Sequence, residues 1–145
     1  MRYKIYGVKN AGFRKEMREA LQSFEQKLGL SNLDHIVIKV KMTKEIDCYG
    51  YCCIEYFDDD DNVIELTLEI QTGQSQEDTI HTLAHEMVHV RQYVRGELSD
   101  GMDVWRGKKI NAESIDYEDQ PWEIEAEKIS DKLYNEWKNA KTIRQ

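Results

Sequence analysis

The pentapeptide His-Glu-Met-Val-His at positions 85 to 89 combines residue types and a spacing that can bind and use a metal ion. Residues four apart on an α-helix share one face, with Cβ atoms about 6 Å apart, so the imidazoles of His85 and His89 can converge on one ion. Glu86 follows the first histidine, which places its carboxylate beside an open coordination position. This spacing predicts a catalytic zinc site on a helix.

Length and charge limit the class of protein. The chain has 145 residues, the size of one domain, and we expect residues 1–145 to form a single unit. Its net charge of -8 argues against a general nucleic-acid binder, which needs basic side chains to neutralise phosphates. No apolar run has the length of a signal sequence or a membrane span. We therefore expect a cytoplasmic protein with neither a membrane nor a nucleic-acid partner.

Two other clusters resemble metal sites. Three cysteines lie between positions 48 and 53, but an odd, clustered set is a poor disulfide framework and lacks nearby histidines for zinc. The aspartates at 58–61 have part of the spacing of a calcium-binding EF-hand loop, yet Val63 stands where that loop requires glycine. Ordinary strand residues and a solvated hairpin turn are the preferred interpretations.

Hydrophobic periodicity predicts one helix and three strands in the first half of the chain. Between Phe13 and Leu28 apolar residues recur every three to four positions, and Gly29 is placed to end this helix. Alternating or β-prone residues then predict strands at 35–42, 49–57 and 62–70. This order predicts an α+β fold with a sheet of about three to four strands that includes antiparallel pairing.

The pentapeptide lies on a second predicted helix, which a third helix follows. We expect the second helix to begin at the capping pair Ser75 and Asp78 and to end at Gly96. Its apolar residues form one stripe, and its histidines lie on another face. Residues 100–119 show no sustained periodicity. A last helix is expected over 122–137, directly after the only proline.

A third zinc ligand must come from outside the pentapeptide, because a catalytic zinc takes three protein ligands and leaves a fourth position for water. His81 lies one turn before His85, where binding the same ion as both other histidines would strain a straight helix. The last predicted helix opens with an acidic segment in which Glu123 and Glu127 share a face. We predict one zinc ion per chain, held by His85, His89 and Glu123.

A zinc-binding His-Glu-x-x-His helix followed by a helix with the pattern Glu-x-x-small-acidic resembles the gluzincin metallopeptidases. Residues 123–127 match the second pattern. The resemblance implies that Glu123 binds zinc, that the small Ala126 lets the helices approach, and that Glu127 accepts a hydrogen bond from a zinc-bound imidazole. In size and order of elements the chain is also similar to the compact ImmA/IrrE-like and SprT-like zinc peptidase domains of bacteria and phages. Because no histidine follows His89, the ImmA-like group is the nearer one.

The expected chemistry is peptide hydrolysis. Zinc would lower the pKa of its bound water toward about 7, and Glu86 would take the proton and later pass it to the leaving amine. The resemblance implies Tyr117, near the last helix, as donor to the developing oxyanion, with His81 as the alternative. The strand before the pentapeptide is expected to offer its edge, at 67–72, to an extended peptide or protein substrate.

Three other interpretations fit parts of the pattern. His85 and His89 could be ordinary helix residues, but the downstream acidic pattern would then need a separate explanation. A non-catalytic zinc protein with a regulatory or adaptor role would not need Glu86 beside an open position. A SprT-like protease acting on DNA-bound proteins is disfavoured by the acidic balance and by the lack of a zinc finger or basic tail in these residues.

Overall fold

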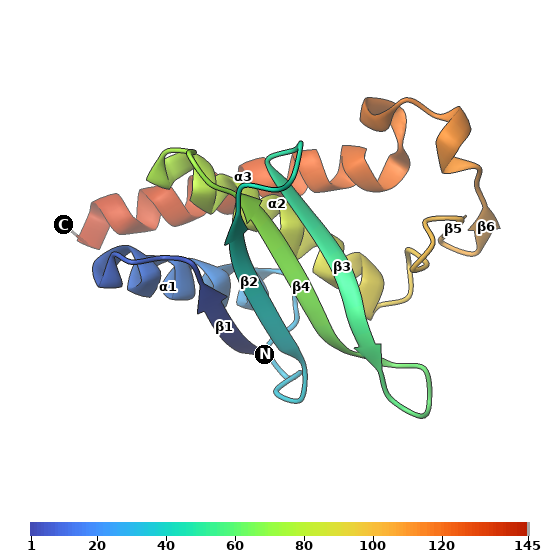
Figure 1. Ribbon diagram of the computed structural model, residues 1–145, viewed down its shortest axis with the longest axis horizontal. Helices are drawn as coiled ribbons and strands as arrows, with labels where there is room; N and C mark the ends of the chain where they lie inside the picture. Colours follow the sequence, from blue (N-terminus) through green and yellow to red (C-terminus); the bar gives the residue numbers. More distant parts are fainter. Residues whose placement is uncertain (145) are drawn as a thin grey trace.

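The computed structural model of the protein describes residues 1–144, which form three α-helices, a four-stranded sheet and a small two-stranded sheet (Figure 1). The elements in chain order are β1 (Arg2–Tyr6), α1 (Ala11–Lys27), β2 (Val37–Thr43), β3 (Gly50–Phe57), β4 (Val63–Gln71), α2 (Gln76–Val94), β5 (Val104–Trp105), β6 (Lys108–Lys109), the short 3-10 helices η1 (Ala112–Ser114) and η2 (Tyr117–Asp119), and α3 (Pro121–Arg144). The predicted α+β class is confirmed. Within residues 1–144, none of the helices combines the length and the apolar character that crossing a membrane requires.

The large sheet is mixed, with its strands in the order β1-β2-β4-β3. β1, β2 and β4 run parallel, and β3 pairs antiparallel with β4. β4 is therefore an interior strand that is hydrogen-bonded on both sides. The prediction that residues 67–72 offer an edge to a peptide is wrong, because β2 and β3 already occupy both edges of that strand. The free edges of the sheet belong to β1 and β3.

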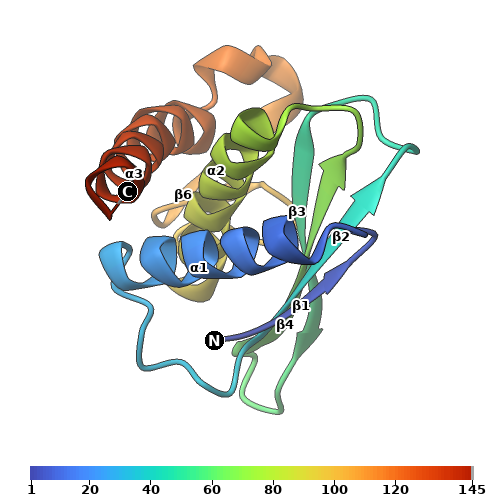
Figure 2. The same cartoon turned by 90° about the vertical axis from the view of Figure 1, so that its left-hand side faces the viewer.

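The helices cover one face of the large sheet (Figure 2). α1 and α2 lie next to the sheet, and α3 packs against α2 on the side away from it. α2 is thus enclosed between β3 and β4 on one side and α3 on the other. Side chains of α2 that point away from the sheet meet the first turns of α3.

Apolar side chains from the helices and the strands form one core. Their sequence periodicity explains their position, because every second residue of a strand and every third or fourth residue of a helix faces the same side. The largest fully buried side chains include Met17, Phe24, Leu68, Ile80 and Trp122. Burying each such side chain stabilises the fold by roughly 1.5–3 kcal/mol. Because buried residues of α2 belong to this core, the core fixes the position of α2.

β1 is the one strand of the large sheet that the sequence analysis did not predict. Only Tyr3 is buried and Ile5 is half-buried, so the strand has too few apolar residues for a clear alternating pattern. Its conformation depends on parallel pairing with β2, more than thirty residues away. The other predicted elements are present with ends shifted by at most two residues, except that α3 continues to Arg144.

Candidate metal centre

α2 presents both histidines because its sequence caps the helix and separates two faces. Ser75 Oγ accepts a hydrogen bond from the Asp78 N–H at 3.0 Å, which is the predicted N-terminal cap. Gly96 follows the helix with a φ of 68°, a left-handed conformation that favours glycine. The apolar stripe of α2 faces the core, so His85 and His89 point toward the first turns of α3.

His85, His89 and Glu123 form a compact group where α2 contacts α3. Glu123 Oε1 lies 2.9 Å from His85 Nε2 and 3.0 Å from His89 Nε2, and the three ligand atoms all lie within 4.8 Å of one another. Two donors at about 2.0–2.1 Å from a tetrahedral zinc are about 3.4 Å apart, so a shift of about half an ångström between Glu123 Oε1 and each imidazole nitrogen would give that separation. Two imidazoles and one carboxylate are also a donor set of catalytic zinc sites. The group could therefore hold the predicted ion.

Electrostatic interactions connect these three residues to one another. Burial raises the pKa of Glu123, but hydrogen bonds from His85 and His89 outweigh burial and bring this pKa down to about 2. Burial lowers the pKa of His89, whereas the hydrogen bond to Glu123 and the charge of Glu86 raise it, with a net value of about 9. At neutral pH Glu123 is thus a carboxylate that accepts a hydrogen bond from an imidazolium.

Zinc binding near neutral pH is expected to release at least about one proton, because an imidazole must be neutral to coordinate zinc and the zinc-bound water can lose a further proton. His89, with a pKa of about 9, carries that proton, and Glu123, with a pKa of about 2, has none to lose. The apparent zinc affinity should rise with pH and level off above the His89 pKa of about 9. Calorimetric titration in buffers of different ionisation enthalpy measures the proton count, and a count near zero would contradict this ion pair.

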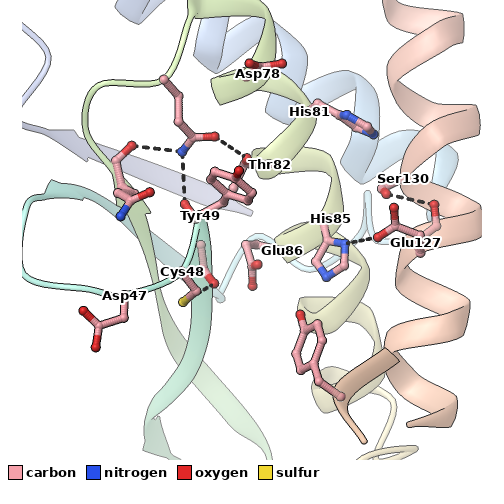
Figure 3. Close-up of a pocket in the computed structure, with 14 residues that line it drawn as sticks. Asp47, Cys48, Tyr49, Asp78, His81, Thr82, His85, Glu86, Glu127 and Ser130 are labelled. Carbon is pink, nitrogen blue, oxygen red and sulfur yellow. Dashed lines mark hydrogen bonds and ion pairs between the residues drawn. The ribbon is translucent and has the colours of Figure 1, made fainter. Parts of the chain in front are cut away.

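Glu86 lies beside the metal group without belonging to it. The residue is only 4% exposed and forms no hydrogen bond with the described residues, yet it lines the cleft in front of His85 (Figure 3). Burial raises the pKa of Glu86, and the opposing effects of His89 and His85 only partly offset that rise. A buried carboxyl of this kind is suited to accept a proton from a molecule in the cleft.

Gly50, the first residue of β3, leaves the space that Glu86 occupies. A Cβ atom at position 50 would lie 3.0 Å from Glu86 Oε1 and 2.6 Å from Thr82 Cγ2. The second distance is shorter than real Cβ contacts, so any larger residue would push against α2. The edge strand can approach the pentapeptide helix this closely only with glycine at this position.

If the predicted peptide hydrolysis takes place at this site, replacing Gly50 with Ala is expected to lower kcat/KM about 100-fold, because a shift of about 1 Å in a catalytic group has effects of that size. Zinc content should not change, since Gly50 does not contact the metal group. Gly101→Ala is the control, because a Cβ there would meet nothing closer than 3.7 Å. The measurement is kcat/KM with matched zinc-loaded proteins. Full activity in both variants would contradict the conclusion that glycine at position 50 makes room for Glu86.

Gln92 has a role at the centre that the sequence analysis did not assign. Its Oε1 accepts a hydrogen bond from His89 Nδ1 at 2.7 Å, and its Nε2 donates to the Trp122 carbonyl oxygen at 3.0 Å. The available signal was a glutamine three residues after the second histidine, close enough on a helix for the side chains to meet. This contact directs His89 Nε2 toward Glu123 and orients the ring for an ion.

Glu127 lies on the open side of the centre. Its Oε2 is 3.7 Å from His85 Nδ1, which is within ion-pair range and longer than a hydrogen bond, and its side chain is 73% exposed. The role that the resemblance implies for Glu127 therefore stays a prediction. At the Nδ1 position, His89 has a buried acceptor, which is Gln92.

The two predicted oxyanion donors lie in different surroundings. Tyr117 donates its O–H to Glu123 Oε1 at 2.9 Å, and burial together with the Glu123 charge raises the pKa of Tyr117, which keeps its proton in place. His81 Nε2 lies 2.8 Å from Asp131 Oδ1, and its ring stacks on Tyr134 at a centroid distance of 4.9 Å. Tyr117 is thus in contact with the metal group, whereas His81 is held against α3.

A cleft of about 950 Å³ opens in front of His85 and Glu86 (Figure 3). Asp47, Cys48 and Tyr49 line it from the sheet side, the first half of α2 lies between, and Glu127 lines it from α3. Gly50 and Tyr117 also line the cleft. Its acidic lining residues are Asp47, Asp78, Glu86 and Glu127, and none of its lining residues is Lys or Arg. The cleft is therefore negatively charged and large enough for several residues of a peptide.

The structure does not assemble the two other clusters into metal sites. Cys48, Cys52 and Cys53 are free thiols, and in residues 1–144 the His85, His89 and Glu123 group is the one set of three potential ligands close enough to share an ion. Asp58 Oδ1 accepts hydrogen bonds from the backbone N–H groups of residues 60 and 62, each at 2.9 Å. Residues 58–61 are therefore a hairpin turn, as preferred from the sequence.

Comparison of the chain with protein-family models, with curated proteins and with solved structures finds no match. The resemblance described above consequently rests on residues 76–96 and 121–131, which contain the two motifs. Function must then be argued from the geometry and chemistry of the site itself, since similar folds carry unrelated activities.

Proposed function

We propose that this protein is a zinc-dependent peptidase with a zincin-like fold, in which His85, His89 and Glu123 hold the ion and Glu86 is the general base. The position of Glu86 is the observation that carries the proposal, because a buried carboxyl without an internal hydrogen bond faces a cleft beside a metal-ligand group. A closed zinc site has four protein ligands and needs no adjacent base, so this arrangement favours hydrolysis over an adaptor role. The three free thiols suit the reducing cytoplasm, where we propose that it acts.

A few side chains have separate roles in the proposed peptide hydrolysis. Zinc, when bound, supplies a Lewis acid that polarises the peptide carbonyl and acidifies water. Glu86 accepts the proton of the attacking water on a carboxylate oxygen and returns it to the leaving amine, a task that suits its raised pKa. Tyr117 exchanges its hydrogen bond to Glu123 for one to the oxyanion. Gln92 holds His89 through Nδ1.

The free edge of β3 is the surface that best accommodates an extended peptide. β3 is the outer strand of the sheet, and Tyr49 and Gly50 at its start line the cleft. A peptide that adds to a sheet edge gains main-chain hydrogen bonds without regard to its sequence. We therefore assign to β3 the substrate contact that the sequence analysis expected of residues 67–72.

Peptides with Lys or Arg next to the scissile bond are expected to be cleaved about 10-fold faster than the same peptides with Glu there, a difference of about 1.4 kcal/mol. The reason is the charge of the cleft, which has acidic but no basic lining residues apart from histidine. The ratio of kcat/KM values for matched peptides measures this preference, and it should decrease at high salt. Equal rates at low salt would contradict it.

The first test is zinc content, measured by elemental analysis of the untagged protein beside His85→Ala prepared identically. We expect one zinc ion per wild-type chain and loss of the metal in the variant, followed by cleavage of a peptide library by the zinc-loaded wild type. A wild type that does not bind added zinc would overturn the proposal. One that binds zinc and cleaves no peptide would favour a non-catalytic regulatory or adaptor role, and cleavage that requires DNA would favour a SprT-like activity.

A further inference from the structure

We propose that Gln92, Glu125 and Arg106 form a support chain that positions His89, so that zinc affinity depends on the β5–β6 hairpin. These are positioning residues, because none belongs to the metal group and each acts through the next. The inference rests on the proposed zinc centre. It gives a function to residues 104–109, which the sequence identifies most simply as a plain surface strand and, as an alternative, as a cover for the cleft or a partner-binding segment.

The inner link is the amide of Gln92, whose orientation its neighbours determine. The side chain is fully buried, and its Nε2 lies 3.0 Å from the Trp122 carbonyl oxygen and 3.2 Å from Glu125 Oε1. Both of these atoms only accept hydrogen bonds, so the NH₂ group must point to them and Oε1 must face His89 Nδ1, at 2.7 Å. A zinc-bound His89 therefore keeps its remaining proton on Nδ1 and presents Nε2 to the ion.

The middle link is Glu125, two residues after the ligand Glu123 on α3. Its Oε1 accepts the hydrogen bond from Gln92, and its Oε2 is paired with the guanidinium of Arg106. Arg91 Nη2 also lies 3.6 Å from Oε1. A carboxylate held between two guanidinium groups and an amide has little rotational freedom, so the position of Arg106 bears directly on that of Gln92.

The outer link is Arg106, in the turn of the β5–β6 hairpin. Its side chain is 53% exposed, yet Nε donates to Glu97 Oε2 at 2.9 Å and the guanidinium lies 4.6 Å from the centre of the Trp105 ring. Its φ of 49° is a left-handed conformation that is disfavoured for residues other than glycine. Several partners thus fix the position of this exposed arginine, which indicates that it connects the hairpin to Glu125.

A second route joins the hairpin to the centre by packing. Trp105 packs against Trp122 with ring centroids 6.2 Å apart, and Trp122 directly precedes the ligand Glu123. The carbonyl group of Trp122 is also an acceptor for Gln92. The hairpin thus supports both the imidazole of His89 and the first turn of α3.

Zinc affinity of the full chain, measured by competition with a chromogenic chelator, tests this inference. Gln92→Leu is expected to weaken zinc binding about 10-fold to 100-fold, the range for outer partners of ligating histidines, and Arg106→Ala about 3-fold to 10-fold because it acts through two other side chains. Arg106→Lys, which keeps a cation beside Glu125, should recover most of the affinity. Lys108→Ala removes the same charge from an exposed position of the hairpin and should match wild type.

A purely structural role for Arg106 gives a different result. Arg106→Ala would then unfold at a lower temperature than Lys108→Ala, while both variants kept the wild-type zinc affinity. That result would overturn the inference and would leave the proposed zinc centre unaffected. If the wild type bound no zinc, the proposed function and the dependence of zinc affinity on the hairpin would both fall, and ¹⁵N NMR of the His89 ring would decide whether Gln92, Glu125 and Arg106 position that ring. A protected Nδ1–H signal that is lost in Gln92→Leu and weakened in Arg106→Ala would support the positioning role of these side chains. Identical spectra for the wild type and both variants would overturn it.

Discussion

Replacing Glu86 with Gln is expected to reduce peptide hydrolysis about 100-fold to 10,000-fold, the usual contribution of a general base. The amide of glutamine has the same shape as the carboxyl, so it fits the space beside Gly50, but it cannot take a proton from water. Zinc binding should persist, because Glu86 is not one of the three clustered ligands. The substitution therefore separates metal binding from catalysis.

The measurement is kcat/KM for one peptide with the wild type and Glu86→Gln, each with its zinc content determined. Glu77→Gln makes the same chemical change at an exposed position in the first turn of α2 and should leave activity unchanged. Hydrolysis by Glu86→Gln at the wild-type rate would remove Glu86 as the base. A loss of zinc in that variant would instead indicate that Glu86 supports the metal site.

Replacing Glu123 with Ala is expected to weaken zinc binding more than about 100-fold, since loss of outer partners alone costs about 10-fold to 100-fold. The substitution removes one of three ligands and leaves the rings of His85 and His89 without the carboxylate they share. Tyr117 loses its acceptor as well. Chelator competition measures the affinity, and circular dichroism verifies that the variant is folded.

Glu127→Ala is the matched control for this ligand, because it removes the same side chain one helical turn later on α3. Glu127 is exposed and 3.7 Å from His85 Nδ1, so its loss should weaken zinc binding about 100-fold at most. If Glu123→Ala kept wild-type affinity while Glu127→Ala lost it, the third ligand would be Glu127. Glu123→Gln retains the shape of the buried side chain and serves if the alanine variant does not fold.

The elements with strong periodicity could be predicted from the sequence, and the way they associate could not. The stripes of α1 and α2 and the alternation of β4 identify each element, because burial of one face imposes a period of 3.6 or 2. Strand order is a different matter, since pairing of β4 with both β2 and β3 depends on contacts between distant segments. For that reason the expected edge at residues 67–72 is inside the sheet, and β1, with few apolar residues, was not predicted.

Some residues of the candidate site could likewise be predicted from the sequence, and others could not. Helical geometry alone brings His85 and His89 together, and the structure adds Glu123 from α3, as predicted from an acidic pattern more than thirty residues later. Gln92 could not be distinguished from a surface glutamine, because its role depends on the backbone carbonyl of Trp122 and on Glu125, both on another helix. Contacts of this kind are visible only after the helices are packed.

The site joins α2 to α3, and His89 and Glu123 are 34 residues apart in the sequence. A bound ion would therefore act as a removable cross-link between α2 and the last sixth of the chain. At a free zinc concentration of about one hundred times Kd, this link would add about 2.7 kcal/mol to the free energy of unfolding. The lifetime of the protein against proteolysis would then depend on the free zinc concentration, quite apart from any effect of zinc on turnover of a substrate.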